Sequence, residues 1–84
     1  MEPNLRIKAT ILEVVENQLR ENSPPETKVT YDRLLAKGYS DQEVRELIGA
    51  VVFSEVYDVL KINKPFDEAR FVKALRRLPK LPWE

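Results

Sequence analysis

Apolar residues recur every three or four positions along four segments of the chain, which is the spacing of one face of an α-helix. In the first segment the stripe includes Ile7, Ile11, Val15 and Leu19, and the broadest stripe runs from Val44 towards Ile62. Proline-containing breaks separate the segments, because the residue before a proline is displaced from the helical region. The pattern predicts helices over residues 5–21, 25–37, 41–62 and 68–78, with a short tail at 79–84.

Polar and special residues mark the expected helix ends. Ser40 and Glu43 have the spacing of a capping box, in which each side chain bonds the other residue's backbone N–H. Pro25 suits a first helical turn, and Gly38 suits a left-handed C-terminal position after Lys37. Phe66 and Phe71 flank an N-cap with the spacing of a hydrophobic staple. The N-caps expected from the sequence are Asn4, Ser40 and Asp67.

The segment 41–62 is expected to be the central helix, because its apolar stripe is wide enough for contact on more than one side. Its many valines also suit a strand, but the capping box and the charge spacing favour a helix. Gly49 beside Ala50 predicts close approach of another helix. The expected core consists of Ile7, Ile11, Val15, Leu19, Leu34, Leu35, Val44, Leu47, Ile48, Val51, Val52, Val56, Leu60, Phe71, Val72 and Leu75.

The two halves of the chain resemble each other, since each contains a long helix, a proline break and a shorter helix. Asn22-Ser23-Pro24 in the first half corresponds to Asn63-Lys64-Pro65 in the second. An internal duplication and a repeated use of helix-breaking residues both account for this match. We expect an all-α fold: four helices in a single domain, arranged as two αα-hairpins with a central third helix.

The chain contains no histidine and no cysteine, which limits the chemistry open to it. The commonest general base, the commonest metal ligand and the thiol nucleophile are all missing. The serines lack a histidine partner, and the carboxylates fit the solvent-facing edges of amphipathic helices. We therefore expect no enzymatic activity, no cofactor and no metal site. The groups considered were Ser23, Ser40, Ser54, Glu13, Glu16, Glu46, Glu55 and Asp58.

Charge and hydropathy restrict the partners. Fourteen basic and fourteen acidic residues give zero net charge, which argues against a strongly basic nucleic-acid binder. The alternative function is nucleic-acid association through a C-terminal basic cluster, with Trp83 as a stacking group. The turn at Gly38 between the second and third predicted helices is similar to that of a helix-turn-helix. The expected nucleic-acid contacts are Lys73, Arg76, Arg77 and Lys80. We expect no membrane segment, no signal peptide and a cytoplasmic location.

Protein association is the function favoured by elimination. Phe53 and Tyr57 extend beyond the main apolar stripe of their helix, and Trp83 ends a proline-rich tail as an anchor would. We expect these three residues to contribute to a contact with a protein partner or with a second copy of the chain. Leu81 and Trp83 are also expected to fold back onto the domain.

Several short motifs, in order along the chain, resemble the small bacterial group known as domain of unknown function 1841 and its relatives. They are Pro3-Asn4-Leu5, Val15-Glu16-Asn17-Gln18-Leu19, Pro24-Pro25-Glu26, Tyr31-Asp32-Arg33-Leu34-Leu35-Ala36-Lys37-Gly38, Ile48-Gly49-Ala50-Val51 and the Ala74-Leu75-Arg76-Arg77-Leu78 helix. The resemblance covers nearly the whole chain. It implies a small all-helical bacterial domain without an established activity.

Relatives of this type often carry histidines in the first helix and beside the Ile-Gly pair. The resemblance places those histidines at Arg6, Thr10 and Glu46, so this chain departs from the pattern at each of them. Any metal binding or chemistry that depends on those histidines is not expected here. We hypothesise instead that Arg6 and Glu46 form an ion pair between the first and third helices.

Overall fold

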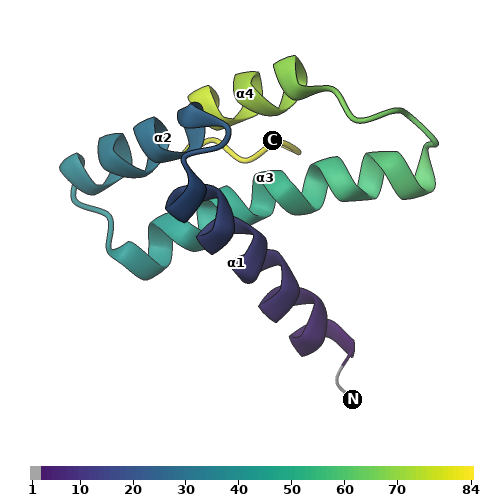
Figure 1. Ribbon diagram of the computed structural model, residues 1–84, viewed down its shortest axis with the longest axis horizontal. Coiled ribbons are helices and arrows are strands. Elements are labelled where there is room, and N and C mark those ends of the chain that lie inside the picture. Colours follow the sequence, from purple (N-terminus) through teal and green to yellow (C-terminus); the bar gives the residue numbers. More distant parts are fainter. Residues whose placement is uncertain (1–2) are drawn as a thin grey trace.

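The computed structural model describes residues 3–84, with side chains from Arg6 onward. It contains four helices: α1 (Pro3–Glu21), α2 (Pro25–Ala36), α3 (Asp41–Lys61) and α4 (Glu68–Arg77) (Figure 1). Each helix end lies within two residues of its predicted position. The predicted all-α fold is therefore confirmed.

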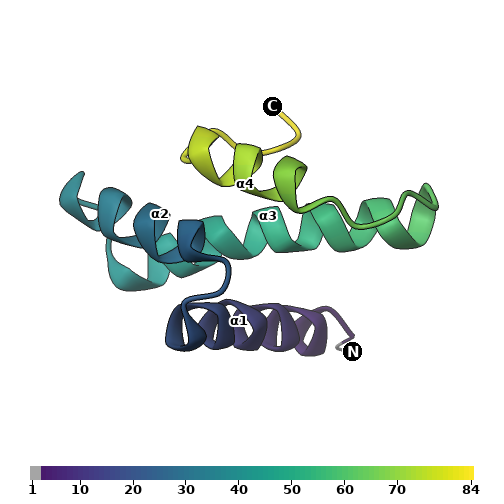
Figure 2. The same cartoon turned by 45° about the horizontal axis from the view of Figure 1, so that its top comes forward.

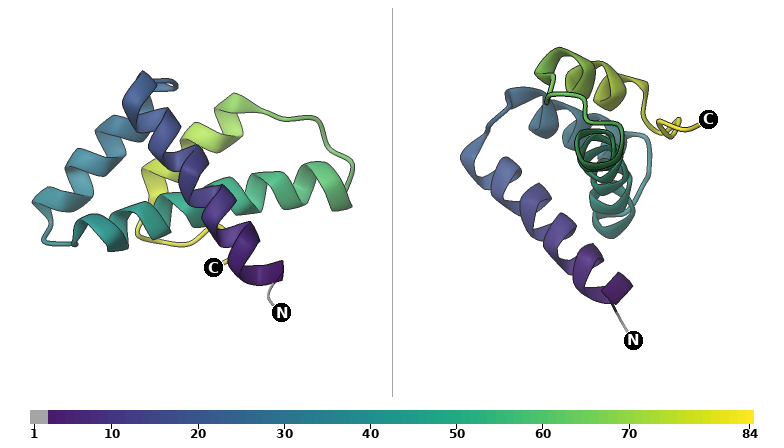
Figure 3. Two further views of the ribbon diagram at one scale, coloured as in Figure 1. Left: turned by 60° about the horizontal axis from the view of Figure 1, so that its bottom comes forward. Right: turned by 90° about the vertical axis from the view of Figure 1, so that its right-hand side faces the viewer.

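Helix α3 is the centre of the arrangement, as its broad apolar stripe predicted. It contacts each of the other three helices, and α2 also contacts α1 and α4. Helix α1 crosses α3 obliquely (Figure 1), and α4 lies on the opposite side of α3 (Figure 2). Seen nearly along its axis, α3 has the other helices arranged around it (Figure 3, right). A residue on α3 can therefore face α1, α2 or α4 according to its position on the helix.

The caps of α3 and α4 form as predicted. Ser40 Oγ accepts a hydrogen bond from Glu43 N at 3.1 Å, and Glu43 Oε1 accepts one from Ser40 N at 2.9 Å. Asp67 Oδ1 accepts from the backbone N–H groups at the start of α4. The rings of Phe66 and Phe71 lie 6.3 Å apart, which agrees with the predicted staple. The predicted N-cap at Asn4 is wrong, because α1 already begins at Pro3.

The first three helices are each followed by a residue in the left-handed conformation. Gly38 has φ of 104°, and Asn22 and Asn63 have φ of 55° and 63°. Asparagine tolerates this region better than most residues with a Cβ. After α2, Tyr39 N donates to Leu34 O at 3.3 Å, which is the long hydrogen bond of a Schellman motif. The corresponding asparagines of the two halves therefore have the same local role.

The core lies where α3 meets its three neighbours. Its fully buried apolar side chains come from all four helices and from the residue that follows α4. Thr27 and Thr30 are buried as well, and Thr27 Oγ1 donates to Gln18 Oε1 at 2.9 Å. Both threonines were outside the predicted core. The buried apolar residues are Val15, Leu34, Val44, Ile48, Val51, Val52, Phe71, Leu75 and Leu78.

Four residues assigned to the core from the sequence are exposed, and these predictions are wrong. Ile7 and Leu60 are 48% and 75% exposed, and Leu35 and Val56 are exposed as well. Because α1 crosses α3 obliquely, its first turns move away from the core, while the last turns of α3 extend past both neighbours (Figure 1). On α2 the buried face consists of Thr27, Thr30 and Leu34, which leaves Leu35 at the edge.

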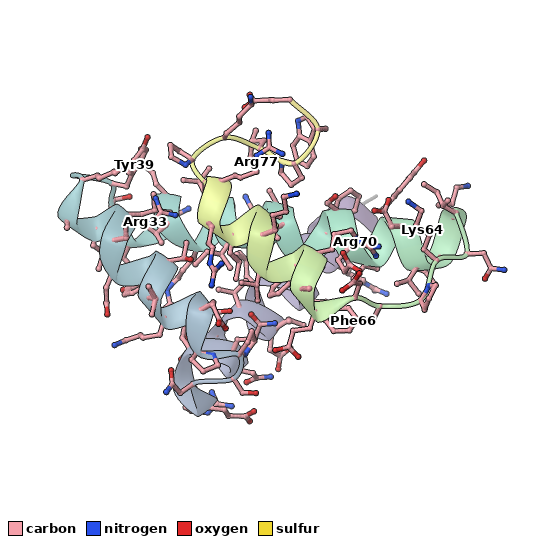
Figure 4. The ribbon with its side chains drawn as sticks, turned by 90° about the horizontal axis from the view of Figure 1, so that it is seen from above. Arg33, Tyr39, Lys64, Phe66, Arg70 and Arg77 are labelled. Atoms are coloured by element: carbon pink, nitrogen blue, oxygen red, sulfur yellow. The ribbon has the colours of Figure 1, made fainter. Side chains whose placement is uncertain are left out.

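Arg33 connects α2 to the C-terminal end of α4 (Figure 4). Its guanidinium donates to Leu78 O at 2.9 Å, Leu75 O at 3.1 Å and Arg76 O at 3.4 Å. The last carbonyls of a helix lack intrahelical donors and carry partial negative charge. Arg33 therefore satisfies these groups and fixes the orientation of α4 against α2.

Candidate interaction surfaces

The three residues predicted for protein association lie close together. Phe53 and Tyr57, one helical turn apart on α3, have ring centroids 6.4 Å apart. Both line a shallow depression with Pro82 and Trp83 of the tail. Trp83 is 62% exposed, and the two α3 rings are nearly half exposed. We call Phe53, Tyr57 and Trp83 the aromatic surface.

An apolar groove between α1 and α3 continues from the aromatic surface. Its volume is about 470 Å³, and both Phe53 and Trp83 belong to its wall. Contact of such apolar surface with water is unfavourable, and contiguous apolar surface is a feature of many binding sites. The apolar side chains that line the groove are Ile7, Ile11, Leu12, Ala50, Phe53 and Trp83.

Gly49 forms the floor of this groove and sets the distance between the helices. A Cβ atom at this position would lie 3.3 Å from Ile11 Cγ2 and 3.7 Å from Leu12 Cδ2. The predicted close approach of a helix at Gly49 is therefore confirmed, and the helix is α1. The groove exists because α1 and α3 touch here and diverge towards the N-terminus of α1.

A charged pair borders the groove, but it is not the predicted one. Lys8 Nζ lies 3.2 Å from Glu46 Oε2, so the hypothesis of an Arg6–Glu46 pair is wrong. Lys8 lies two positions beyond Arg6 on α1, and it is Lys8 that lies on the groove side with Glu46. The Gln42 amide, which donates to Glu46, and Lys8 together hold the pKa of Glu46 below its ordinary value.

A second network joins α1, α2 and α3 at the start of α3. Arg45 forms ion pairs with Glu16 of α1 and with Asp41 of its own helix, and its guanidinium lies 5.7 Å from the centre of the Tyr31 ring. Tyr31 Oη donates to Asp41 Oδ1 at 2.5 Å. This hydrogen bond, followed by that from Arg45, lowers the pKa of Asp41. The network explains why the acidic start of α3 is fixed against its neighbours.

Glu55 is buried rather than solvent-facing, and the sequence interpretation of this residue is wrong. It is 7% exposed and forms a bidentate ion pair with Arg70 of α4. Arg70 Nη2 lies 2.6 Å from Glu55 Oε2, and Arg70 Nε lies 3.2 Å from Glu55 Oε1. Asp67 N donates to the same carboxylate at 3.3 Å. The carboxylate also raises the pKa of Arg70. Glu55 thus fixes the start of α4 on α3.

The basic residues near the C-terminus do not form one cluster. Lys73, Arg77 and Lys80 line a pocket of about 290 Å³ between α3, α4 and the tail, and Arg70 is in its wall. Arg76 does not line this pocket. We call this cavity, which has Arg70, Lys73, Arg77 and Lys80 in its wall, the basic pocket. In Figure 4, Arg70 extends from α4 towards α3, and Arg77 lies beside the tail.

Sequence reasoning included Arg76 and missed Arg70, although the spacing contained the signal. Positions 70, 73 and 77 are separated by three and four residues, which keeps them on one face of α4, and Lys80 reaches the same pocket from the tail that follows the helix. Arg76 lies about 100° away from Arg77 around the helix. Counting basic residues identified the region, and helical spacing would have identified the face.

Among the described residues, no group of three or more acidic side chains is placed to hold a metal ion. Ser40 is used as a helix cap, and Ser54 lines the basic pocket. In residues 3–84, none of the helices combines the length and apolarity needed to cross a membrane. Comparisons with protein-family models, with curated proteins and with solved structures give no match for this chain.

Proposed function

We propose that this protein is a non-catalytic association module that binds a protein partner or a second copy of itself through the aromatic surface and the adjoining groove. The observation that carries the proposal is the placement of Phe53, Tyr57 and Trp83 around one depression, with each ring exposed. Aromatic anchors grouped in this way dominate the binding energy of many protein interfaces.

The contrast with the other exposed apolar residues supports this choice. Val29 on α2 and Leu60 near the end of α3 are more exposed than Phe53, but neither lines the groove or the depression. Single exposed apolar residues need no explanation on a protein surface, whereas the largest continuous apolar patch is often a functional site. The aromatic surface and the groove share Phe53 and Trp83, so they form such a patch.

Sedimentation equilibrium of the full chain over a wide concentration range is the first test. If the module binds itself, Phe53→Ser and Trp83→Ala should each weaken the dimer about tenfold or more, as expected for interface anchors. Val29→Ser is the matched control, since it also replaces an exposed apolar side chain on a helix, and it should leave the dimer unchanged. Equal weakening by all three variants would show non-specific aggregation.

If the wild-type chain stays monomeric, the same variants test for a different partner. An affinity pull-down from bacterial lysate, treated with nuclease, should then recover a stoichiometric protein with the wild type and with Val29→Ser, but not with Trp83→Ala. Recovery of the same proteins with all variants would remove the aromatic surface as the binding site.

This proposal also includes a bacterial origin and a cytoplasmic location. The bacterial origin is implied by the resemblance to domain of unknown function 1841. The location is supported by a composition without cysteine, since small exported domains usually rely on disulfides.

Nucleic-acid association remains the alternative function, supported by the exposure of Lys73, Arg76, Arg77 and Lys80. A gel-shift assay at low salt tests it, because phosphate contacts are strongest there. A shift at micromolar protein that is lost at higher salt would favour this alternative, and no shift would remove it.

A further inference from the structure

The basic pocket has a net positive charge within a concave surface. It is lined by four cationic side chains and two carboxylates, those of Glu55 and Asp58. Glu55 is paired with Arg70, so these two charges offset each other. Lys73, Arg77 and Lys80 form no ion pair within the described residues. Three positive charges therefore face a single carboxylate, that of Asp58.

Contacts between α3, α4 and the tail fix the positions of the pocket walls. The Glu55–Arg70 pair fixes α4 on α3 along one side, and Leu81 and Pro82 of the tail close another side. Arg33 contacts the terminal carbonyls of α4, as described above. These carbonyls carry the negative end of the helix dipole, which would otherwise repel an anion near Arg77. The Arg33 guanidinium offsets this charge, so the C-terminal end of α4 is compatible with an anionic ligand.

We propose that the basic pocket binds a compact phosphorylated small molecule, with Lys73, Arg77 and Lys80 contacting the phosphate oxygens. Arginine and lysine are the usual protein donors to phosphate, and arginine can donate two parallel hydrogen bonds. A pocket of about 290 Å³ lies just below the range typical of small-molecule sites, about 300–1,000 Å³. Its size therefore suits a ligand of one or two phosphate groups with a small organic part.

Pyrophosphate is the probe, titrated into the ¹⁵N-labelled full chain at constant ionic strength set with sodium chloride. The pocket model expects saturable shifts of the amides of Ser54 and of residues 73–81, apart from Pro79, which has no N–H, while α2 is unaffected. Inorganic phosphate should bind at the same residues more weakly, because it carries fewer oxygens and less charge. Shifts spread evenly over all basic residues, or no saturation at about 10 mM, which corresponds to negligible affinity, would overturn the proposal.

Arg76 provides a matched control for Arg77, because the two are neighbouring exposed arginines on the same helix and only Arg77 lines the pocket. Arg77→Gln should weaken pyrophosphate binding about fivefold or more, and Arg76→Gln by less than about twofold, as expected for the loss of one direct phosphate contact. Equal effects of the two variants would show that only the general charge of the surface matters, and this would overturn the proposal.

Two double variants extend the test. Lys73→Gln/Lys80→Gln should abolish pyrophosphate binding, whereas Lys61→Gln/Lys64→Gln, with the same loss of charge at the far end of α3, should not. Thermal unfolding of each variant checks that the fold is retained. A single-stranded oligonucleotide is titrated in parallel. If the oligonucleotide binds, if Arg76→Gln and Arg77→Gln weaken its binding equally, and if pyrophosphate does not bind, the pocket proposal is overturned in favour of an extended nucleic-acid surface.

Discussion

The two sides of α3 are covered in different ways. Towards α4, the buried side chains of Phe71, Leu75 and Leu78 fill the interface, and the polar Glu55–Arg70 pair closes its edge. Towards α1, Val15 is the only α1 side chain among the described residues that is fully buried, and Ile11 and Leu12 are half-buried along an open groove. The chain itself covers the α4 side of α3, whereas the α1 side keeps open apolar surface, which is the surface that we propose for binding.

The reason lies in the geometry of the two helices. Helix α4 is short, and it is held by Arg33 at its C-terminal end and by Glu55 at its N-terminal end. Helix α1 is held near its C-terminal half by Gln18 and by the Arg45 network, while its first turns diverge from α3. The experiments below test whether this difference in structure is also a difference in energy, from the largest expected effect to the smallest.

Truncation of a core residue under α4 should have the largest effect. Leu75 is fully buried, so Leu75→Ala removes apolar contacts and leaves a cavity, at a cost of about 3 kcal/mol. Ile7→Ala on the groove side should cost less than about 1 kcal/mol, because Ile7 is half exposed. Urea unfolding measures both. Similar costs for the two variants would contradict the proposed difference between the sides.

Loss of the Arg33 contacts should have the next largest effect. Arg33→Met keeps much of the aliphatic stem but removes the donors to the terminal carbonyls of α4, at an expected cost of about 2 kcal/mol. Arg33→Lys, which keeps the charge and can reach fewer acceptors, should fall between the wild type and Arg33→Met. An Arg33→Met variant as stable as the wild type would show that water replaces these donors without loss of stability.

The buried carboxylate on the α4 side should matter more than the exposed one on the α1 side. Glu55→Gln leaves Arg70 without its negative partner inside a buried contact, which should cost about 1–2 kcal/mol. Glu46→Gln removes the partner of Lys8 at an exposed position, and its effect should be the smaller of the two. Chemical denaturation at two salt concentrations distinguishes them, because only the exposed pair should be screened by salt.

Substitution at the floor of the groove tests how firmly α1 is held. Gly49→Ala gains helix propensity, worth about 1 kcal/mol in an exposed helix, but the new methyl group requires a small shift of Ile11. Because Ile11 borders an open groove, we expect it to move, and we expect a net gain of about 0.5 kcal/mol. A loss of stability would mean that the α1 side is packed as rigidly as the α4 side.

The smallest effect is expected from pH. The folded-state pKa values of Asp41 and Glu46 lie below the ordinary values of 3.8 and 4.5. A lowered folded pKa adds stability above the ordinary pKa, and this is lost as pH falls through the lowered value. We therefore expect a nearly constant melting temperature from pH 6 to 8, where no histidine titrates, and a decline below about pH 4.5. Asp41→Asn and Glu46→Gln should each reduce this decline, and a midpoint near pH 6 would contradict the assignment.

The sequence by itself determined the local structure. Periodicity placed four helices, and Ser40, Asp67 and Gly38 marked their ends, because caps and turns depend on interactions within a few residues. It also identified α3 as the central helix, since the width of its apolar stripe is a local property. The sequence marked Phe53 and Tyr57 as surplus to the apolar stripe and Trp83 as an anchor in the tail, but it did not predict that the three rings lie around one depression.

Only the tertiary structure decided which apolar residues are covered and which charged residues meet. Ile7 and Leu60 satisfy the helical pattern and are exposed, because the crossing of α1 and the projecting end of α3 are set by packing between helices. Glu55 meets Arg70, and Arg33 reaches the end of α4, across sequence separations of 15 and 42 to 45 residues. Such contacts depend on the relative positions of whole helices, which local periodicity does not contain.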